Sequence, residues 1–178
     1  AIADVGGNTI MIFQKSGLKG EIETTLPIEK ISVSNQGIVS AILKNESTPQ
    51  IISYDAVGNI LVEHQVNLNS TGYPISLDMS ADGENLMVSY LSTKNGTLKS
   101  MVAFYNFGKE GQEKTDNLIY TEDFEQTVVP DVFYMDASTS VAVGDRSFVI
   151  YEGTKSVKKK TEVKLNQEIR SEFHSDRY

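Results

Sequence analysis

Apolar residues in this chain occur in short runs that are separated by clusters of Gly, Asn, Asp and Ser. The runs are "NTIMIF", "GIVSAIL", "QIISY", "NLMVSYL", "SMVAFY", "SVAV" and "SFVIY". No segment keeps apolar residues at positions i, i+3, i+4 and i+7 over three helical turns, so the pattern gives no long amphipathic helix. Many short β-rich runs between turn residues predict an all-β protein.

The runs recur in a fixed order along the chain. Four of them end in an aromatic residue that is soon followed by glycine: "IMIFQKSG", "IISYDAVG", "VAFYNFG" and "FVIYEG". The aromatics are 41, 51 and 46 residues apart. Turn-like segments "SNQG", "SADG" and "DAST" lie between two strand-like runs, and their starts are 46 and 56 residues apart. A period in the forties with four strands per unit predicts the antiparallel blades of a β-propeller.

This period divides the chain into about four blades within a single propeller domain, residues 1–178. The predicted blades span residues 1–26, 31–66, 75–121 and 132–165, and residues 168–173 are predicted to form an extra inner strand. Blade one lacks an innermost strand, so the extra strand would close a four-bladed ring. The alternative is that the chain is an arc of a larger propeller with six to eight blades.

The blade motifs carry a resemblance. The segments "ISYDAVGNIL" and "LDMSADGENLMVSYL" resemble the repeat propellers of the quinoprotein-like and YVTN-type group. The chain has no Trp, so it lacks the Trp-Asp dipeptide of WD40 repeats and the tryptophan docking motifs of quinone-dependent dehydrogenases. The resemblance implies an uncharacterised bacterial propeller that is displayed on the cell surface, in several cases behind an N-terminal membrane anchor. The resemblance implies no catalytic residue and no cofactor for this chain.

Composition narrows the classes of partner. The net charge is −8, with 16 Lys and Arg against 24 Asp and Glu. This charge argues against nucleic acid as a binding partner, because binding to phosphates needs clustered basic residues. The sequence contains no Cys, so disulfides and thiolate chemistry are excluded. No apolar run approaches the ~20 residues that a membrane helix needs, so this segment is not predicted to span a membrane.

One segment has the spacing of a calcium loop. Asp78, Ser80, Asp82 and Gly83 occupy its first, third, fifth and sixth places. The twelfth place holds Ser89 instead of a bidentate Glu, and the flanking segments are strand-like. Because an Asp-Gly pair also suits a tight turn, the sequence favours a hairpin here and leaves these residues as a weak metal candidate.

Catalytic chemistry has little support in the sequence. Only two histidines are present, His64 and His174, and the sequence indicates no nucleophile–histidine set around either of them. Carboxylates are plentiful, which keeps open an alternative in which channel-facing acids serve a glycoside hydrolase or lyase.

The remaining candidate is a binding surface. Tyr73, Asp123, Phe124 and Glu125 fall in segments that connect one predicted blade to the next, and such loops form one face of a propeller. Aromatic anchors among charged groups suit a protein interface. The sequence therefore predicts a non-enzymatic recognition or scaffold module that binds a protein, a peptide or a cell-wall component. A third interpretation is purely structural, in which the chain is one arc of a larger propeller.

Overall fold

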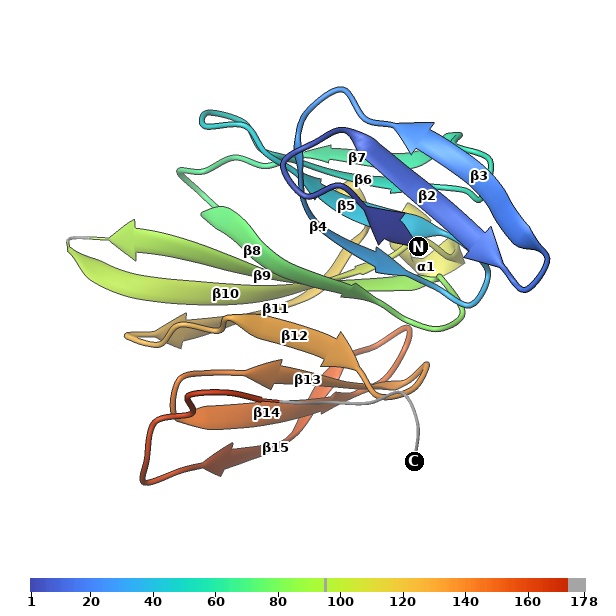
Figure 1. Cartoon of the computed structure of the whole chain (residues 1–178). Helices are drawn as coiled ribbons and strands as arrows, with labels where there is room; N and C mark the ends of the chain where they lie inside the picture. The colour runs from blue at the N-terminus through green and yellow to red at the C-terminus, as the bar shows by residue number, and fades with distance from the viewer. Residues whose placement is uncertain (95, 173–178) are drawn as a thin grey trace.

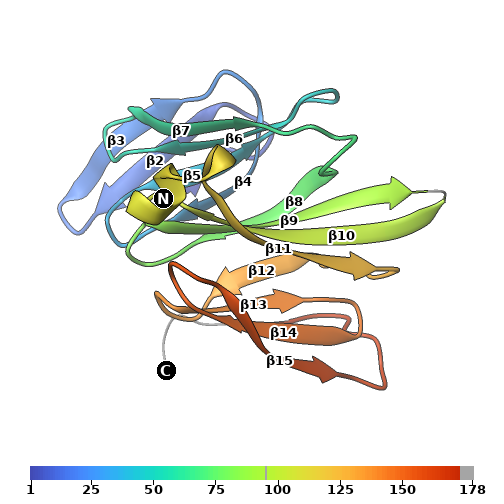
Figure 2. The same cartoon turned by 180° about the vertical axis from the view of Figure 1, so that it is seen from behind.

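The computed structural model describes residues 1–94 and 96–172. The chain folds into four antiparallel sheets that follow one another in sequence order, as predicted for a β-propeller (Figures 1 and 2). Each sheet is a meander in which neighbouring strands are consecutive in the sequence. We refer to the sheets as blades one to four.

Blades one and two lie in the N-terminal half. Blade one has three strands, β1 (Ile2–Ala3), β2 (Thr9–Gln14) and β3 (Gly17–Glu23). Blade two has four, β4 (Ile28–Val33), β5 (Val39–Leu43), β6 (Gln50–Tyr54) and β7 (Ile60–Gln65).

Blades three and four each have four strands. Blade three contains β8 (Tyr73–Met79), β9 (Asn85–Lys94), β10 (Thr97–Asn106) and β11 (Leu118–Glu125). Its last two strands are joined by a short helix α1 (Lys109–Gln112) and the 3-10 turn η1 (Thr115–Asn117). Blade four contains β12 (Asp131–Tyr134), β13 (Thr139–Val143), β14 (Ser147–Glu152) and β15 (Lys158–Lys164).

The aromatic–glycine motif has a local explanation. Tyr54, Tyr105 and Tyr151 are each the last or the next-to-last residue of the third strand in blades two to four, and all three are buried. In blade two, Gly58 forms the following turn with a φ of +92°, a conformation that only glycine adopts at low cost. The equivalent aromatic of blade one, Phe13, is 46% exposed because no further blade lies against that side of the sheet.

Apolar clusters hold the blades together. The first joins the β2 and β3 residues Ile10 and Ile22 to Val39 and Ile52 of blade two. A second cluster lies between blades two and three, and a third lies between blades three and four. Since a single blade cannot bury both of its faces, stacking of neighbouring sheets supplies the core.

The described residues form an open arc and not a closed ring. Blade one and blade four lie at opposite ends of the stack in both views (Figures 1 and 2). The prediction of an extra inner strand at residues 168–173 is not met: residues 168–172 are not in a strand, and Phe173 and His174 lie outside the described residues. This segment instead crosses blade four, where the Ile169 amide donates to the Asp145 carbonyl oxygen at 2.7 Å. Blade one is too far away for the segment to pair with it.

Candidate functional site

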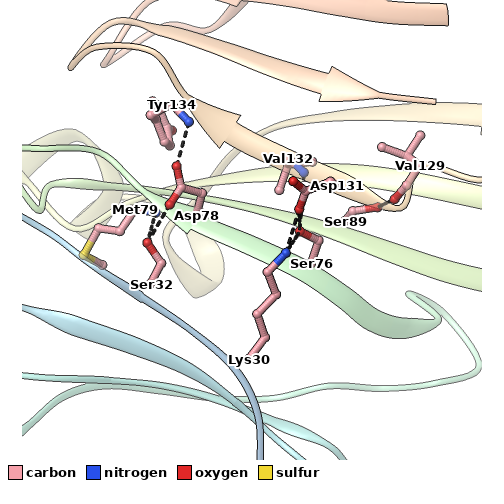
Figure 3. A network of polar contacts seen from close by, with 10 residues as sticks. All are labelled: Lys30, Ser32, Ser76, Asp78, Met79, Ser89, Val129, Asp131, Val132 and Tyr134. Carbon is pink, nitrogen blue, oxygen red and sulfur yellow. Dashed lines mark hydrogen bonds and ion pairs between the residues drawn. The ribbon is translucent and has the colours of Figure 1, made fainter. Parts of the chain in front are cut away.

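The innermost strands of blades two, three and four lie side by side and carry polar side chains at alternate positions. β8 contacts β4 on one side and β12 on the other. We call the polar side chains at this junction the inner-strand network; its members are Lys30, Ser32, Ser76, Asp78 and Asp131 (Figure 3). Side chains alternate between the two faces of a strand, so residues two apart point to the same side.

Lys30 anchors one half of the inner-strand network. Its Nζ donates to the Ser76 Oγ at 2.7 Å and to the Asp131 Oδ1 at 2.6 Å. The Ser76 hydroxyl also donates to Asp131 Oδ1, at 2.6 Å, and accepts from the Val132 amide. One lysine of blade two is thereby joined to blades three and four. The Lys30 side chain is still 39% exposed, so it can be reached from solvent.

Asp78 anchors the other half and also joins three blades. Its Oδ1 accepts from the Ser32 hydroxyl at 2.6 Å, and its Oδ2 accepts from the Tyr134 amide at 2.7 Å. The Met79 amide donates back to Ser32 Oγ at 3.0 Å. Hydrogen bonds to a carboxylate are stronger than those between neutral groups, so Asp78 fixes the relative position of the inner strands.

A second carboxyl group reaches the inner-strand network from the segment that crosses blade four. Partial burial and the adjacent Asp131 carboxylate raise the pKa of Glu172 to about 7. Hydrogen bonds from Lys30 and Ser76 outweigh burial and lower the pKa of Asp131. The two carboxyl groups share a hydrogen bond, and their pKa values shift in opposite directions.

This pair predicts a pH dependence of the packing of residues 165–172. The pKa of Glu172 is about 7 in the folded chain and 4.5 in the unfolded chain, so the folded chain binds this proton more tightly. The stability that this proton contributes is therefore lost as pH rises from 4.5 to about 7. Asp131 and Lys30 are the charged groups that act on Glu172, and Asp131 stays charged throughout this range. We expect the hydrogen-exchange protection factor of the Ile169 amide to fall a few-fold between pH 5 and pH 8. Glu172→Gln should abolish this change; equal protection of the unsubstituted chain at both pH values would contradict it.

The calcium-like segment forms a hairpin between β8 and β9. The Gly83 amide donates to the Ser80 carbonyl at 2.9 Å, and Gly83 has a φ of +75°. Ser80 Oγ donates to Asp82 Oδ1, whereas the hydrogen bonds of the Asp78 carboxylate run to Ser32 and Tyr134. Over residues 1–94 and 96–172, no group of three or more His, Asp or Glu side chains is arranged to hold a metal ion.

The predicted binding residues lie at one end of blade three. Tyr73 begins β8, and Asp123, Phe124 and Glu125 end β11. Strand pairing places Tyr73 opposite Leu91 of β9, Leu91 opposite Ser100 of β10, and Ser100 opposite Phe124. The two predicted groups therefore share one row of the blade but lie at its opposite edges.

Charged neighbours fix these side chains. The Tyr73 hydroxyl donates to Glu29 Oε2 at 2.8 Å, and burial together with this carboxylate raises the pKa of the phenol. Lys99 lies between Asp123 at 3.0 Å and Glu125 at 3.1 Å. Phe124 is half-buried against the cluster between blades three and four. We call Tyr73, Glu29, Lys99, Asp123, Phe124 and Glu125 the blade-three end surface.

Comparison of the sequence with protein families gives a match to the family of unknown function DUF5711 over residues 1–178. The chain belongs to the DUF5711 family. Comparison with curated proteins gives no significant match.

Solved structures with a similar fold place this DUF5711 chain among the β-propellers. Hsv2 of Kluyveromyces marxianus superposes with a TM-score of 0.61 at 14% identity, covering 90% of this chain and 56% of Hsv2. The acylaminoacyl peptidase of Pyrococcus horikoshii superposes with a TM-score of 0.54 at 12% identity, and the match covers 85% of this chain and 27% of the peptidase. A protein of unknown function from Bacteroides caccae superposes with a TM-score of 0.52 at 13% identity, and the match covers 93% of this chain and 57% of that protein. The DUF5711 chain thus spans little more than half of Hsv2, and these likenesses concern the fold alone.

The sequence did not single out the inner-strand network of this DUF5711 chain. Lys30, Ser76 and Asp131 are far apart in sequence and belong to three different repeats. A signal was present, because "KIS" and "SLD" put polar residues at alternate positions of inner strands that are 46 residues apart. The described residues include no helix of the length and apolarity needed to cross a membrane.

Proposed function

We propose that this chain is a non-enzymatic recognition module that binds a protein or peptide segment through the blade-three end surface. The observation that carries the proposal is the charged end of blade three, where Lys99 lies between Asp123 and Glu125 at one edge and Tyr73 bonds to Glu29 at the other edge. Three of the charged groups are acidic and one is basic, so the surface favours a segment that presents Lys or Arg beside an apolar side chain. The inner-strand network keeps this surface rigid, which limits the entropy lost on binding.

Support also comes from the fold class. Propellers commonly bind partners on loops held by a rigid scaffold. We further propose that the module acts on the outer face of the cell membrane of a bacterium, a placement that rests on the resemblance of its blade motifs to surface propellers. A cell-wall component is the alternative ligand on that face.

The paired carboxyl groups bear on the alternative function as a hydrolase. Opposite pKa shifts of Asp131 and Glu172 are a feature of acid–base pairs in enzymes. These two groups, however, share a hydrogen bond, whereas glycoside hydrolases separate their carboxyl groups by about 5 Å or more. Such close contact suits a structural link between the inner strands, so we favour binding over catalysis.

The blade-three end surface can be tested with peptides selected against the chain from a random phage-displayed library. We expect the double variant Tyr73→Ala, Glu125→Lys to weaken binding of the selected peptides by about tenfold or more, because it removes an aromatic anchor and a charge. The control is Glu84→Lys, an exposed charge in the turn at the opposite end of blade three, which should leave affinity unchanged. Equal affinities of the double variant and the unsubstituted chain would remove this surface from consideration.

A further inference from the structure

Blade three carries an insertion that contacts both neighbouring blades. It consists of residues 107–117, between β10 and β11, and it contains α1 and η1. We call it the blade-three insertion. Toward blade four, the Glu110 carboxylate accepts from the Lys155 ammonium at 2.6 Å. Toward blade two, Asp116 of η1 lies at a small pocket that also contains His64 of β7. The insertion therefore connects three successive blades.

The α1 half of the blade-three insertion is fixed to the end of β10. The Gly111 amide donates to Asn106 Oδ1 at 3.1 Å. A Cβ atom at Gly111 would overlap the Asn106 carbonyl oxygen, so a residue without a side chain is needed for this close approach. Together with the ion pair to blade four, this contact anchors α1.

The η1 half has a less favourable backbone. Asp116 and Asn117 have φ values of +56° and +60°, in the left-handed region that residues other than glycine adopt at a cost. Such conformations persist where surrounding contacts hold them. The position of η1 therefore depends on its contacts with blade two.

The pocket at this contact is small and largely dry. Its apolar wall consists of Ile51, Val62, Leu86 and Phe107. The His64 imidazole packs on the Tyr105 ring, with centroids 5.7 Å apart. The free volume of about 10 Å³ has room for at most one water molecule. A charged imidazolium at this position would lose most of its hydration.

The groups around His64 do not compensate for this loss. Burial lowers the pKa of His64 from its usual 6.5, and the attraction of the Asp116 carboxylate opposes burial without outweighing it. Tyr105 is the other titratable group that lines the pocket. Burial raises its pKa to about 12, so the phenol stays neutral. A proton is therefore bound more tightly by a solvated His64 than by the buried one.

We propose that the blade-three insertion is a proton-operated latch, in which η1 covers His64 while the imidazole is neutral and moves away when it is protonated. Opening hydrates the imidazolium and releases Asp116 and Asn117 from the left-handed region, while α1 stays anchored. The closed position is most stable above pH 6.5 and loses stability as pH falls below this value.

The latch is independent of the blade-three end surface. Asn106, after which the insertion begins, pairs with Asn85 at one end of β10, whereas Lys99 of the blade-three end surface lies near the other end. Peptide binding and opening of the latch can therefore succeed or fail separately.

Hydrogen exchange at η1 tests the latch. The Asn117 and Leu118 amides donate within η1, to the carbonyl oxygens of Lys114 and Thr115. We expect the protection factors of these two amides to fall several-fold from pH 7.5 to pH 5, because η1 opens. The Val66 amide, which donates within blade two, should keep its protection, since the blades themselves stay folded.

Three variants identify the group that operates the latch. His64→Phe keeps a ring against Tyr105 without a titratable nitrogen and should abolish the pH dependence. The matched control is His174→Phe, at the other histidine of the chain, which should retain it. Asp116→Asn should make the loss of protection at pH 5 larger, because it removes the attraction that opposes burial. Protection that stays constant or rises toward pH 5 would overturn the proposal, as would an unchanged fall in His64→Phe.

Discussion

Replacing Tyr151 with Ala should lower the free energy of unfolding by about 4 kcal/mol, the range found when a large buried aromatic is truncated. The side chain is fully buried between blades three and four. Its ring packs edge-on against Phe104, with centroids 4.9 Å apart, and its hydroxyl donates to Glu122 Oε2 at 2.7 Å. Truncation therefore leaves a cavity where two blades meet and removes a charge-assisted hydrogen bond.

The measurement is urea denaturation followed by circular dichroism, with Tyr151→Phe as the matched variant. Phenylalanine keeps the ring and removes only the hydroxyl, and Glu122 keeps its ion pair with Lys159 at 2.8 Å, so we expect a loss of about 1 kcal/mol. Similar losses for the two variants would show that packing of the ring contributes little. Because Tyr151 belongs to β14 and packs at the interface between blades three and four, hydrogen exchange should report the largest loss of protection in blade four.

The position of Tyr151 was accessible from the sequence because it belongs to a repeat. An aromatic followed by glycine at intervals of 41, 51 and 46 residues requires the same local structure each time, and Tyr54, Tyr105 and Tyr151 are each the last or the next-to-last residue of a third strand. Blade architecture is a local property that is set by strand patterning and turn residues. For this reason, the all-β class and the division into blades were predictable.

The end of the chain was less predictable because its placement depends on contacts that are distant in sequence. Residues 168–172 have strand-like composition, but a strand forms only where an open edge is within reach. Blade one lies at the far end of the arc, and blade four already has the inner strand β12 (Figure 1). The segment instead donates from Ile169 to a turn of blade four. Ring closure depends on the angle between blades, which strand patterning does not encode.

The candidate site was predictable only in part for the same reason. Tyr73 and Phe124 were expected on connecting segments, and the structure places them in one row of blade three, at its opposite edges. The sequence singled out Asp78 only as the first position of a calcium-like loop. Its carboxylate instead links blades two and four through contacts with residues 46 and 56 positions away.

Asp78→Ala should lower the free energy of unfolding by about 3 kcal/mol, which is roughly 9 °C in Tm for a domain of this size. The substitution removes two hydrogen bonds to a carboxylate, from the Ser32 hydroxyl at 2.6 Å and from the Tyr134 amide at 2.7 Å. The Tyr134 amide belongs to a packed inner strand, so losing its acceptor adds the cost of an unpaired backbone donor. The expected loss is therefore larger than for an ordinary surface carboxylate.

A second aspartate of blade three provides the control for this experiment. Asp123 is 54% exposed in its side chain and pairs with Lys99 at 3.0 Å. Exposed ion pairs contribute about 0.5 kcal/mol, so Asp123→Ala should shift Tm by no more than roughly 2 °C. Differential scanning calorimetry of both variants would make the comparison. Equal shifts would mean that Asp78 acts as a surface charge, and the rigidity attributed to the inner-strand network would then have to come from the apolar clusters alone.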